Sequence, residues 1–213
     1  MNRQAYDETY LDYAQKNLGE AFTYASICCG IDMDSFMGRF LVSRLAEEFG
    51  RGNPKYVVGL SGTELAMEVL ERTGFREDFP PVFRTELSLP EQYWCGWILA
   101  LYQWYSRRSF REIHAALPMQ DILQAYPAMH QSPEEKFLEM AETRLAEWSN
   151  TNKLQQQRRL MAYSQRILAE RSGVNLRTLQ QYESGAKDLH KASYDTVKAL
   201  ADALCCTPEA ILP

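Results

Sequence analysis

Arginine and glutamine side chains gather at helical spacing in one short stretch near the C-terminal end of the chain, residues 164–185. Guanidinium and amide groups are the side-chain groups that hydrogen-bond to base edges in the major groove of DNA. Arg177 and Gln181 lie four positions apart, so on a helix they share one face. An arginine can read guanine, a glutamine can read adenine, and an apolar Leu176 could contact a thymine methyl group. The candidate base-reading residues are Asn175, Leu176, Arg177, Thr178, Gln180 and Gln181.

Two short helices joined by a tight turn are needed to present these side chains. Ser164 is a good N-cap for the first helix, because its hydroxyl can accept a hydrogen bond from a free backbone N–H of the first turn. Gly173 ends that helix where a positive φ is expected, and Asn175 can cap the second helix. Leu179 and Tyr182 would then face the core. This arrangement predicts a helix-turn-helix whose second helix lies in the major groove.

The stretch belongs to a longer pattern that resembles a known family. Residues 152–213 resemble the lambda-repressor/Cro (XRE-like) DNA-binding domain, a bundle of five short helices. The residues that carry the likeness are Leu154, Arg158, Ser164-Gln165, Leu168-Ala169-Glu170, Ser172-Gly173-Val174, Leu179, Tyr182-Glu183, Gly185, Leu200-Ala201, Leu204 and Thr207–Leu212. Leu176 departs from the family, in which a polar residue is common at this position.

The resemblance implies roles for further residues. The amide of Gln165, with the N-terminus of its helix, would grip a DNA phosphate. A loop after the second helix, where relatives contact the DNA backbone, contains Lys187, His190 and Lys191. Arg158 and Glu183 match positions that pair between the first helix and the end of the recognition helix. The alternative interpretation of these polar residues is that they form an ordinary solvated surface with no role in DNA binding.

Charge is divided unevenly along the chain. The formal net charge is −5 over 213 residues. Residues 1–150 contain 14 Lys and Arg and 22 Asp and Glu, a net charge of −8, whereas residues 151–213 have a net charge of +3. An acidic body joined to a mildly basic module is typical of a localised phosphate-binding face. We therefore expect double-stranded DNA as a partner and salt-sensitive binding.

Cysteine usage and the absence of special segments indicate a reduced, cytoplasmic protein. The five cysteines have neither metal-ligand spacing nor a Cys-x-x-Cys motif, so we expect free thiols and no metal site. No signal-peptide core follows Met1, and the longest apolar run, residues 93–105, is too short to span a bilayer. No cofactor motif or catalytic constellation is found, so we expect neither a cofactor nor an enzyme.

The rest of the chain predicts an all-α fold. Apolar periodicity, capping boxes and turn residues place helices at 5–29, 35–49, 62–73, 90–106, 110–117, 119–126 and 133–148, with a short extended piece at Tyr56–Val58. The capping boxes begin at Ser61, Ser88, Ser109 and Ser132. The polar cluster 149–152 marks a boundary between an acidic helical domain, 1–149, and a five-helix DNA-binding domain, 150–213.

Three tryptophans of the most apolar helix, Trp94, Trp97 and Trp104, lie on one face. Indoles at helical spacing are most often core or interface residues. The alternative interpretation is that the three tryptophans form a binding site for an effector.

These observations favour a sequence-specific transcriptional regulator, most simply a repressor that binds as a homodimer. A narrower hypothesis is the antitoxin of a toxin–antitoxin operon, with residues 1–149 binding a toxin-like protein. A protein-interaction adaptor that retains the helix-turn-helix as a scaffold, and an enzyme with unfamiliar chemistry in the first domain, are the alternatives. No membrane partner is expected.

Overall fold

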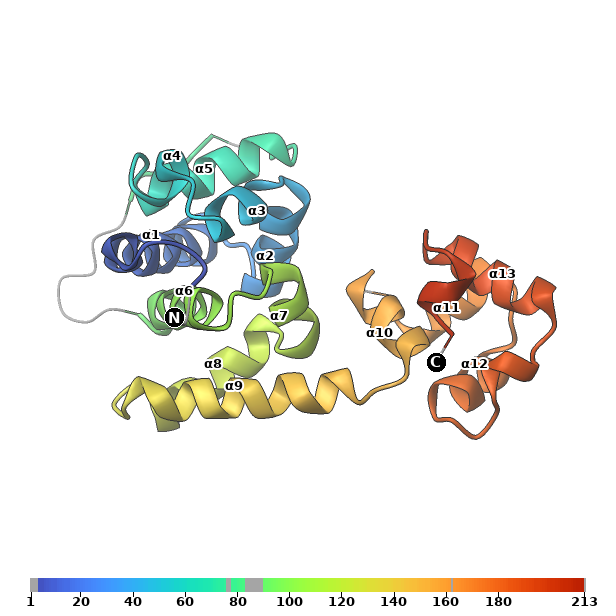
Figure 1. The fold of residues 1–213 in the computed structure, drawn as a ribbon. Coiled ribbons are helices and arrows are strands. Elements are labelled where there is room, and N and C mark those ends of the chain that lie inside the picture. The colour runs from blue at the N-terminus through green and yellow to red at the C-terminus, as the bar shows by residue number, and fades with distance from the viewer. Residues whose placement is uncertain (1–3, 76–77, 83–89, 162, 213) are drawn as a thin grey trace. The chain divides into compact units, whose positions relative to one another are not determined.

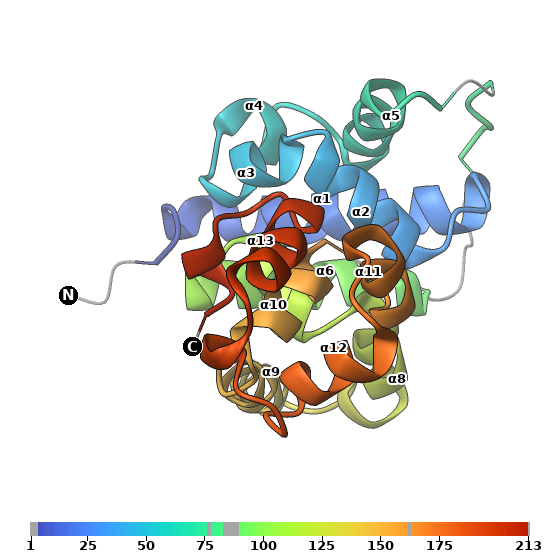
Figure 2. The same cartoon turned by 90° about the vertical axis from the view of Figure 1, so that its right-hand side faces the viewer.

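Helices form every regular element in the part of the chain that the structure describes (Figures 1 and 2). The computed structural model describes residues 4–75, 78–82, 90–161 and 163–212. The chain divides into two compact units, Met1–Leu145 and Ala146–Pro213. The division falls in the last turn of a helix, ahead of the polar cluster where the sequence predicts a domain boundary. The predicted all-α fold is confirmed.

The first unit is built from short helices around one core. Its elements are η1 (Glu8–Tyr10), α1 (Leu11–Thr23), the π-helical η2 (Tyr24–Cys28), α2 (Met33–Val42), α3 (Leu45–Gly50), α4 (Pro54–Val57), α5 (Gly62–Arg72), α6 (Glu91–Ser106), α7 (Phe110–Ala116), α8 (Met119–Met129) and α9 (Glu134–Ser149). The second unit contains α10 (Lys153–Leu160), α11 (Gln165–Ser172), α12 (Leu176–Glu183), η3 (Leu189–Lys191), α13 (Tyr194–Ala203) and η4 (Pro208–Ala210). The last predicted helix of that domain is the 3-10 segment η4.

A close crossing of α1 and α6 organises the first unit (Figure 1). A Cβ added at Gly96 would collide with the carbonyl oxygen of Leu18, and one added at Gly19 would lie 2.9 Å from the ring of Tyr93. The two glycines therefore let the backbones approach, and this packing buries Cys95 and its neighbours. Burial, and secondarily Glu91, raises the pKa of the Cys95 thiol to about 12, so it stays protonated.

Two of the predicted capping boxes are confirmed by their hydrogen bonds. Ser61 Oγ accepts from the Glu64 N–H at 3.3 Å while the Ser61 N–H donates to Glu64 Oε2 at 2.8 Å. Ser109 and Glu112 make the same pair of bonds at 3.2 and 2.8 Å. These bonds begin α5 and α7. The box predicted at Ser88 lies outside the described residues.

The helix predicted at 35–49 is wrong as a single element. Arg44 has φ +66°, which separates α2 from α3. Ser43 stabilises the break, because its Oγ donates to the Phe40 carbonyl at 2.8 Å and accepts from the Leu45 N–H at 3.2 Å. The break turns both helices toward a shared aromatic cluster, in which the Phe40 and Phe49 rings lie 6.0 Å apart.

The extended piece predicted at Tyr56–Val58 is also wrong. Asn53 accepts from the Lys55 N–H at 3.1 Å and caps the one-turn helix α4, with Pro54 at its first position. Proline suits that position because its missing N–H would have had no helical partner. Tyr56 and Val57 are buried by this turn rather than by strand pairing. Similarly, α8 continues through Pro127 to Met129, beyond the predicted end at Tyr126.

Candidate nucleic-acid interface

The turn between α11 and α12 forms as its residues predict. Ser164 Oγ accepts a hydrogen bond from the Ile167 N–H at 3.1 Å and caps α11. Gly173 ends α11 with φ +69°. Asn175 Oδ1 accepts from the Arg177 N–H at 2.9 Å and caps α12. The turn is therefore held by a cap, a left-handed glycine and a second cap within twelve positions of chain, 164–175.

The inner faces of both helices are buried in a small core. Leu168 of α11 and Leu179 of α12 have no exposed surface, and Tyr182 is 8% exposed. They pack with residues of α10 and α13 and with the residues that directly follow α13 and η4, namely Leu154, Val197, Leu200, Ala201, Leu204 and Ile211. Because this core surrounds the inner side of α12, the opposite side is left to solvent.

The predicted base-reading residues occupy that outer side, although not all to the same degree. Asn175, Leu176, Arg177 and Gln180 are exposed, whereas Thr178 and Gln181 are half-buried. The Arg177 guanidinium makes no hydrogen bond or ion pair with any described residue. The side-chain oxygen of Asn175 is already used as the cap.

A buried ion pair fixes α12 against α10. Arg158 Nε donates to Glu183 Oε1 at 2.6 Å, and Arg158 Nη2 donates to Glu183 Oε2 at 2.8 Å. The two side chains are 8% and 2% exposed. Nη1 of Arg158 also donates to the carbonyl of Tyr163 at 2.7 Å, just before α11. The predicted contact is present, and it ties three segments together.

Gln165 extends this ion pair into a network that the sequence did not reveal. Its Nε2 donates to Glu183 Oε2 at 2.8 Å, and its Oε1 accepts from Gln180 Nε2 at 3.4 Å. Gln165 was predicted as a phosphate ligand, and its amide retains one N–H beyond the bond to Glu183. The signal available in the sequence was Glu183 itself, a carboxylate beside the core-facing Tyr182, which needs donors when buried.

The loop after α12 presents its basic side chains to solvent. Lys187, His190 and Lys191 are exposed, while Leu189 is 2% exposed and anchors η3 to the core. Asp188 accepts from the His190 N–H at 2.9 Å and caps η3. The three residues are thus carried on an ordered loop, which is what a backbone contact with DNA would require.

We compared the sequence of the chain with known protein families. The Helix-turn-helix family model matches residues 154–211. Residues 154–211 are a helix-turn-helix domain of the lambda-repressor/Cro (XRE-like) type. Such a domain is a DNA-binding module of transcription regulators. Neither the curated proteins nor the solved structures yielded a match to the chain.

Outside the helix-turn-helix domain, the structure separates the three predicted tryptophans. Trp94 and Trp97 line a hollow of about 340 Å³ together with Tyr126 and Phe137. Trp104 lies elsewhere, where its Nε1 donates to the Tyr6 carbonyl at 2.9 Å. Trp104 is therefore a structural contact of the N-terminal segment, and any ligand site would involve Trp94 and Trp97 alone.

Three other features of the described residues bear on function. None of the described helices combines the length and apolar character that a membrane span requires. No described group of three or more His, Cys, Asp or Glu side chains is arranged to hold a metal ion. None of the five cysteines, all of which lie in the described part of the chain, forms a disulfide. Burial, and secondarily Cys205, raises the pKa of Cys206 above its usual value.

Proposed function

We propose that this protein is a sequence-specific transcriptional repressor that inserts α12 into the major groove of its operator. The observation that carries the proposal is the outer face of α12. The Arg177 guanidinium is exposed and has no partner among the described residues, while the inner face of the same helix is buried and held by the Arg158–Glu183 pair. A helix held rigidly with free polar tips suits direct readout of bases.

Seven of the predicted contacts have a role in this proposal. Arg177 reads guanine, and Gln181, one turn further along the same face, reads adenine. Leu176 is 38% exposed, and in this proposal it contacts a thymine methyl group. The N-terminus of α11 with Gln165 binds a phosphate. The loop after α12 adds phosphate contacts through Lys187, His190 and Lys191.

Dimerisation completes the proposal. One helix-turn-helix domain offers few base contacts, so two copies on a palindromic operator are needed for affinity and specificity. Residues 1–149 supply the dimer contact, a partner-binding surface, or both. In the narrower form of the proposal, those residues bind and neutralise a toxin-like protein, and the complex represses its own promoter. Persistent failure of a neighbour-encoded protein to co-purify with the chain would count against that narrower form.

The test measures binding of the full chain to DNA from upstream of its own coding region by gel shift. Arg177→Ala is expected to weaken operator binding by about 1–3 kcal/mol and to relax base preference at one position. Gln181→Ala is expected to do the same at a second position, because each substitution removes a base contact. Lys198→Ala is the matched control, because Lys198 lies on α13 and is paired at 3.3 Å with Asp202.

Two outcomes would contradict the proposal. Equal binding of operator and unrelated DNA by the native protein and both variants would exclude specific readout. Failure of the native protein to bind DNA at low salt would favour the adaptor alternative, in which the helix-turn-helix serves as a scaffold.

A further inference from the structure

The hollow of about 340 Å³ that Trp94 and Trp97 line lies in the first unit, between the first half of α6 and the turn that joins α8 to α9 (Figure 1). Half of the ten described residues that line it are aromatic, namely Tyr93, Trp94, Trp97, Tyr126 and Phe137. We call it the aromatic hollow. Its volume and its apolar lining with a few polar groups are typical of small-molecule sites.

The rings of the aromatic hollow stand at steep angles to one another. The centroid of the Trp94 ring lies 5.5 Å from that of Tyr126, at an interplanar angle of 67°, and 5.7 Å from that of Phe137, at 87°. The rings therefore form walls in more than one direction rather than one flat surface. Phe137 is 1% exposed and lies at the floor of the hollow. Trp94, Trp97 and Tyr126 are half-buried, so they keep ring surface that a ligand can reach.

The formal charge at the aromatic hollow is negative. Glu134, in the first turn of α9, supplies the only carboxylate among the described residues that line it, and these residues include no lysine or arginine. The Glu134 carboxylate makes no hydrogen bond or ion pair with another described residue. The surrounding region, 1–150, has a net charge of −8. An anionic ligand would therefore be repelled, whereas a cation would be attracted.

Aromatic rings add a second attraction for a cation. The face of an aromatic ring carries negative electrostatic potential, which is strongest for tryptophan, and several such rings together recognise quaternary ammonium groups. An alkylated ammonium ion is also weakly hydrated and apolar at its surface, so it gains from leaving water for an aromatic wall. Rings on the walls and a free carboxylate at the rim are thus complementary to an organic cation.

We propose that the aromatic hollow binds a small organic ammonium ion, with its alkyl groups against Trp94, Trp97 and Tyr126 and its charge near Glu134. A neutral apolar ligand would use the rings but not the carboxylate. An inorganic cation would use the carboxylate but would lose its hydration shell against the apolar walls. The proposal concerns the first unit alone and is independent of whether α12 reads DNA.

The test is calorimetric titration of the full chain with three small molecules of nearly the same shape and different charge. These are choline, the neutral 3,3-dimethyl-1-butanol and the anionic 3,3-dimethylbutanoate. Choline is expected to bind about tenfold more tightly than the alcohol, because only its charge distinguishes it, and the carboxylate is expected not to bind. The titrations are run at pH 8, because protonation of His130, which also lines the hollow, would oppose a cation.

Two variants separate the contribution of the carboxylate from that of the rings. Glu134→Gln is expected to weaken choline binding about fivefold and to leave binding of the alcohol unchanged, because charge attraction at an exposed position is modest. Glu135→Gln is the matched control, because Glu135 is also exposed in the first turn of α9 but does not line the hollow. Trp97→Leu keeps an apolar side chain but removes a ring, and is expected to weaken choline binding about tenfold.

Thermal melting shows whether Trp97→Leu folds, and Glu134→Gln tests the site without changing a packed residue. The proposal would be overturned if choline did not bind at about 10 mM, a weak-affinity limit. Equal affinity for choline and its neutral isostere would overturn it as well, as would equal choline affinity of Glu134→Gln and Glu135→Gln. Binding of a poly-lysine peptide in place of choline would assign the hollow to a basic protein partner and would also refute a small ligand.

Discussion

Glu183 is the carboxylate on which two side chains of the helix-turn-helix domain converge. Arg158 binds it with two hydrogen bonds of 2.6 and 2.8 Å, and Gln165 adds a third at 2.8 Å. Because the carboxylate is 2% exposed, water cannot replace a lost partner. For the stability of the domain, the strength of the Arg158–Glu183 pair therefore matters less than the free-energy cost of leaving one of the two charges buried without a partner.

Arg158→Met is expected to destabilise the helix-turn-helix domain by about 3 kcal/mol, because it leaves the Glu183 carboxylate without its charge partner. Hydrogen exchange of backbone amides in residues 154–211 measures the change within this domain. Arg166→Met is the control, because the Arg166–Glu170 pair is 82% and 65% exposed and should contribute less than about 0.5 kcal/mol. Equal losses in the two variants would contradict the prediction.

His114 is expected to give the first unit a pH-dependent stability. Burial lowers the pKa of His114 below its usual value, with the Asp34 carboxylate acting in the opposite direction. Its Nδ1 is buried without a hydrogen bond to any described residue and lies 3.7 Å from Asp34 Oδ1. Asp34 itself already accepts from the N–H groups of Met119 at 2.8 Å and Gln120 at 3.2 Å. The folded state therefore favours the neutral imidazole.

The unfolded chain takes up a proton at His114 near pH 6.5, before the folded protein does. The stability that the neutral imidazole contributes is thus complete above about pH 6.5 and is lost as the pH falls toward the lowered pKa. His114→Gln is expected to flatten the decline in urea midpoint between about pH 7.5 and 5.5. Parallel midpoint curves for the variant and the native protein would show that His114 is not the group responsible.

At the scale of elements, the close crossing of α1 and α6 depends on glycine. Gly96→Ala is expected to cost about 3 kcal/mol, because the new methyl group would overlap the Leu18 carbonyl and force the helices apart. Gly38→Ala in α2 is the matched control, since a Cβ there meets no atom within 4 Å, and it should be neutral or stabilise by about 0.5 kcal/mol. Urea unfolding of both variants provides the measurement. Similar midpoints would mean that the crossing can relax.

At the scale of the molecule, the division of charge predicts how the domains affect DNA binding. Residues 1–150 have a net charge of −8 and residues 151–213 a net charge of +3. Removing residues 1–149 is expected to raise affinity for non-specific DNA on the order of tenfold at low salt, because electrostatic repulsion is removed. The gain should disappear at high salt, where charges are screened. Fluorescence anisotropy over a salt series measures the affinity of the truncated chain and of the full chain for non-specific DNA. A ratio of these two affinities that does not change with salt would contradict the prediction.

Local chemistry was sufficient to predict the features of helix ends in which the interacting groups lie within a few residues of each other. The caps at Ser61, Ser109, Ser164 and Asn175, and the positive φ of Gly173, follow from residue type and spacing, and all were predicted. These features are satisfied within one helical turn, so they do not depend on how the helices pack.

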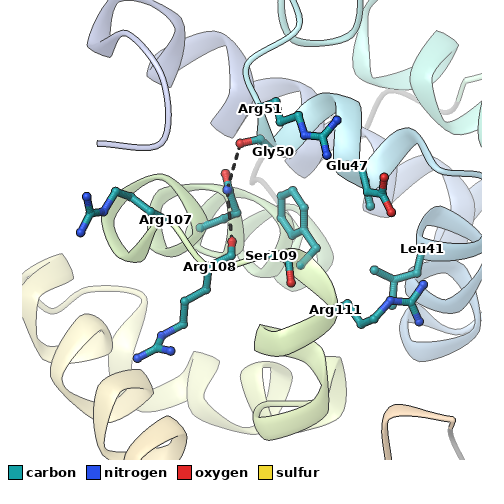
Figure 3. A pocket seen from close by; sticks show the side chains of 11 residues that line it. Leu41, Glu47, Gly50, Arg51, Arg107, Arg108, Ser109 and Arg111 are labelled. Carbon is teal, nitrogen blue, oxygen red and sulfur yellow. Dashed lines mark hydrogen bonds between the residues drawn. The ribbon is translucent and has the colours of Figure 1, made fainter. Parts of the chain in front are cut away.

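Only the tertiary structure decided which distant residues meet. The break at Arg44 lets Phe40 pack against Phe110, with ring centroids 5.4 Å apart, and Trp104 is separated from Trp94 by its hydrogen bond to the N-terminal segment. Likewise, the C-terminal end of α3 meets the end of α6 only in the folded chain, where Gln103 Nε2 donates to the Gly50 carbonyl at 3.1 Å (Figure 3). Such contacts depend on how whole helices pack, because rotating a helix changes which of its residues contact each neighbouring helix. The limits and caps of α12 could therefore be predicted directly from the sequence, whereas the contact between α3 and α6 became visible only in the folded chain.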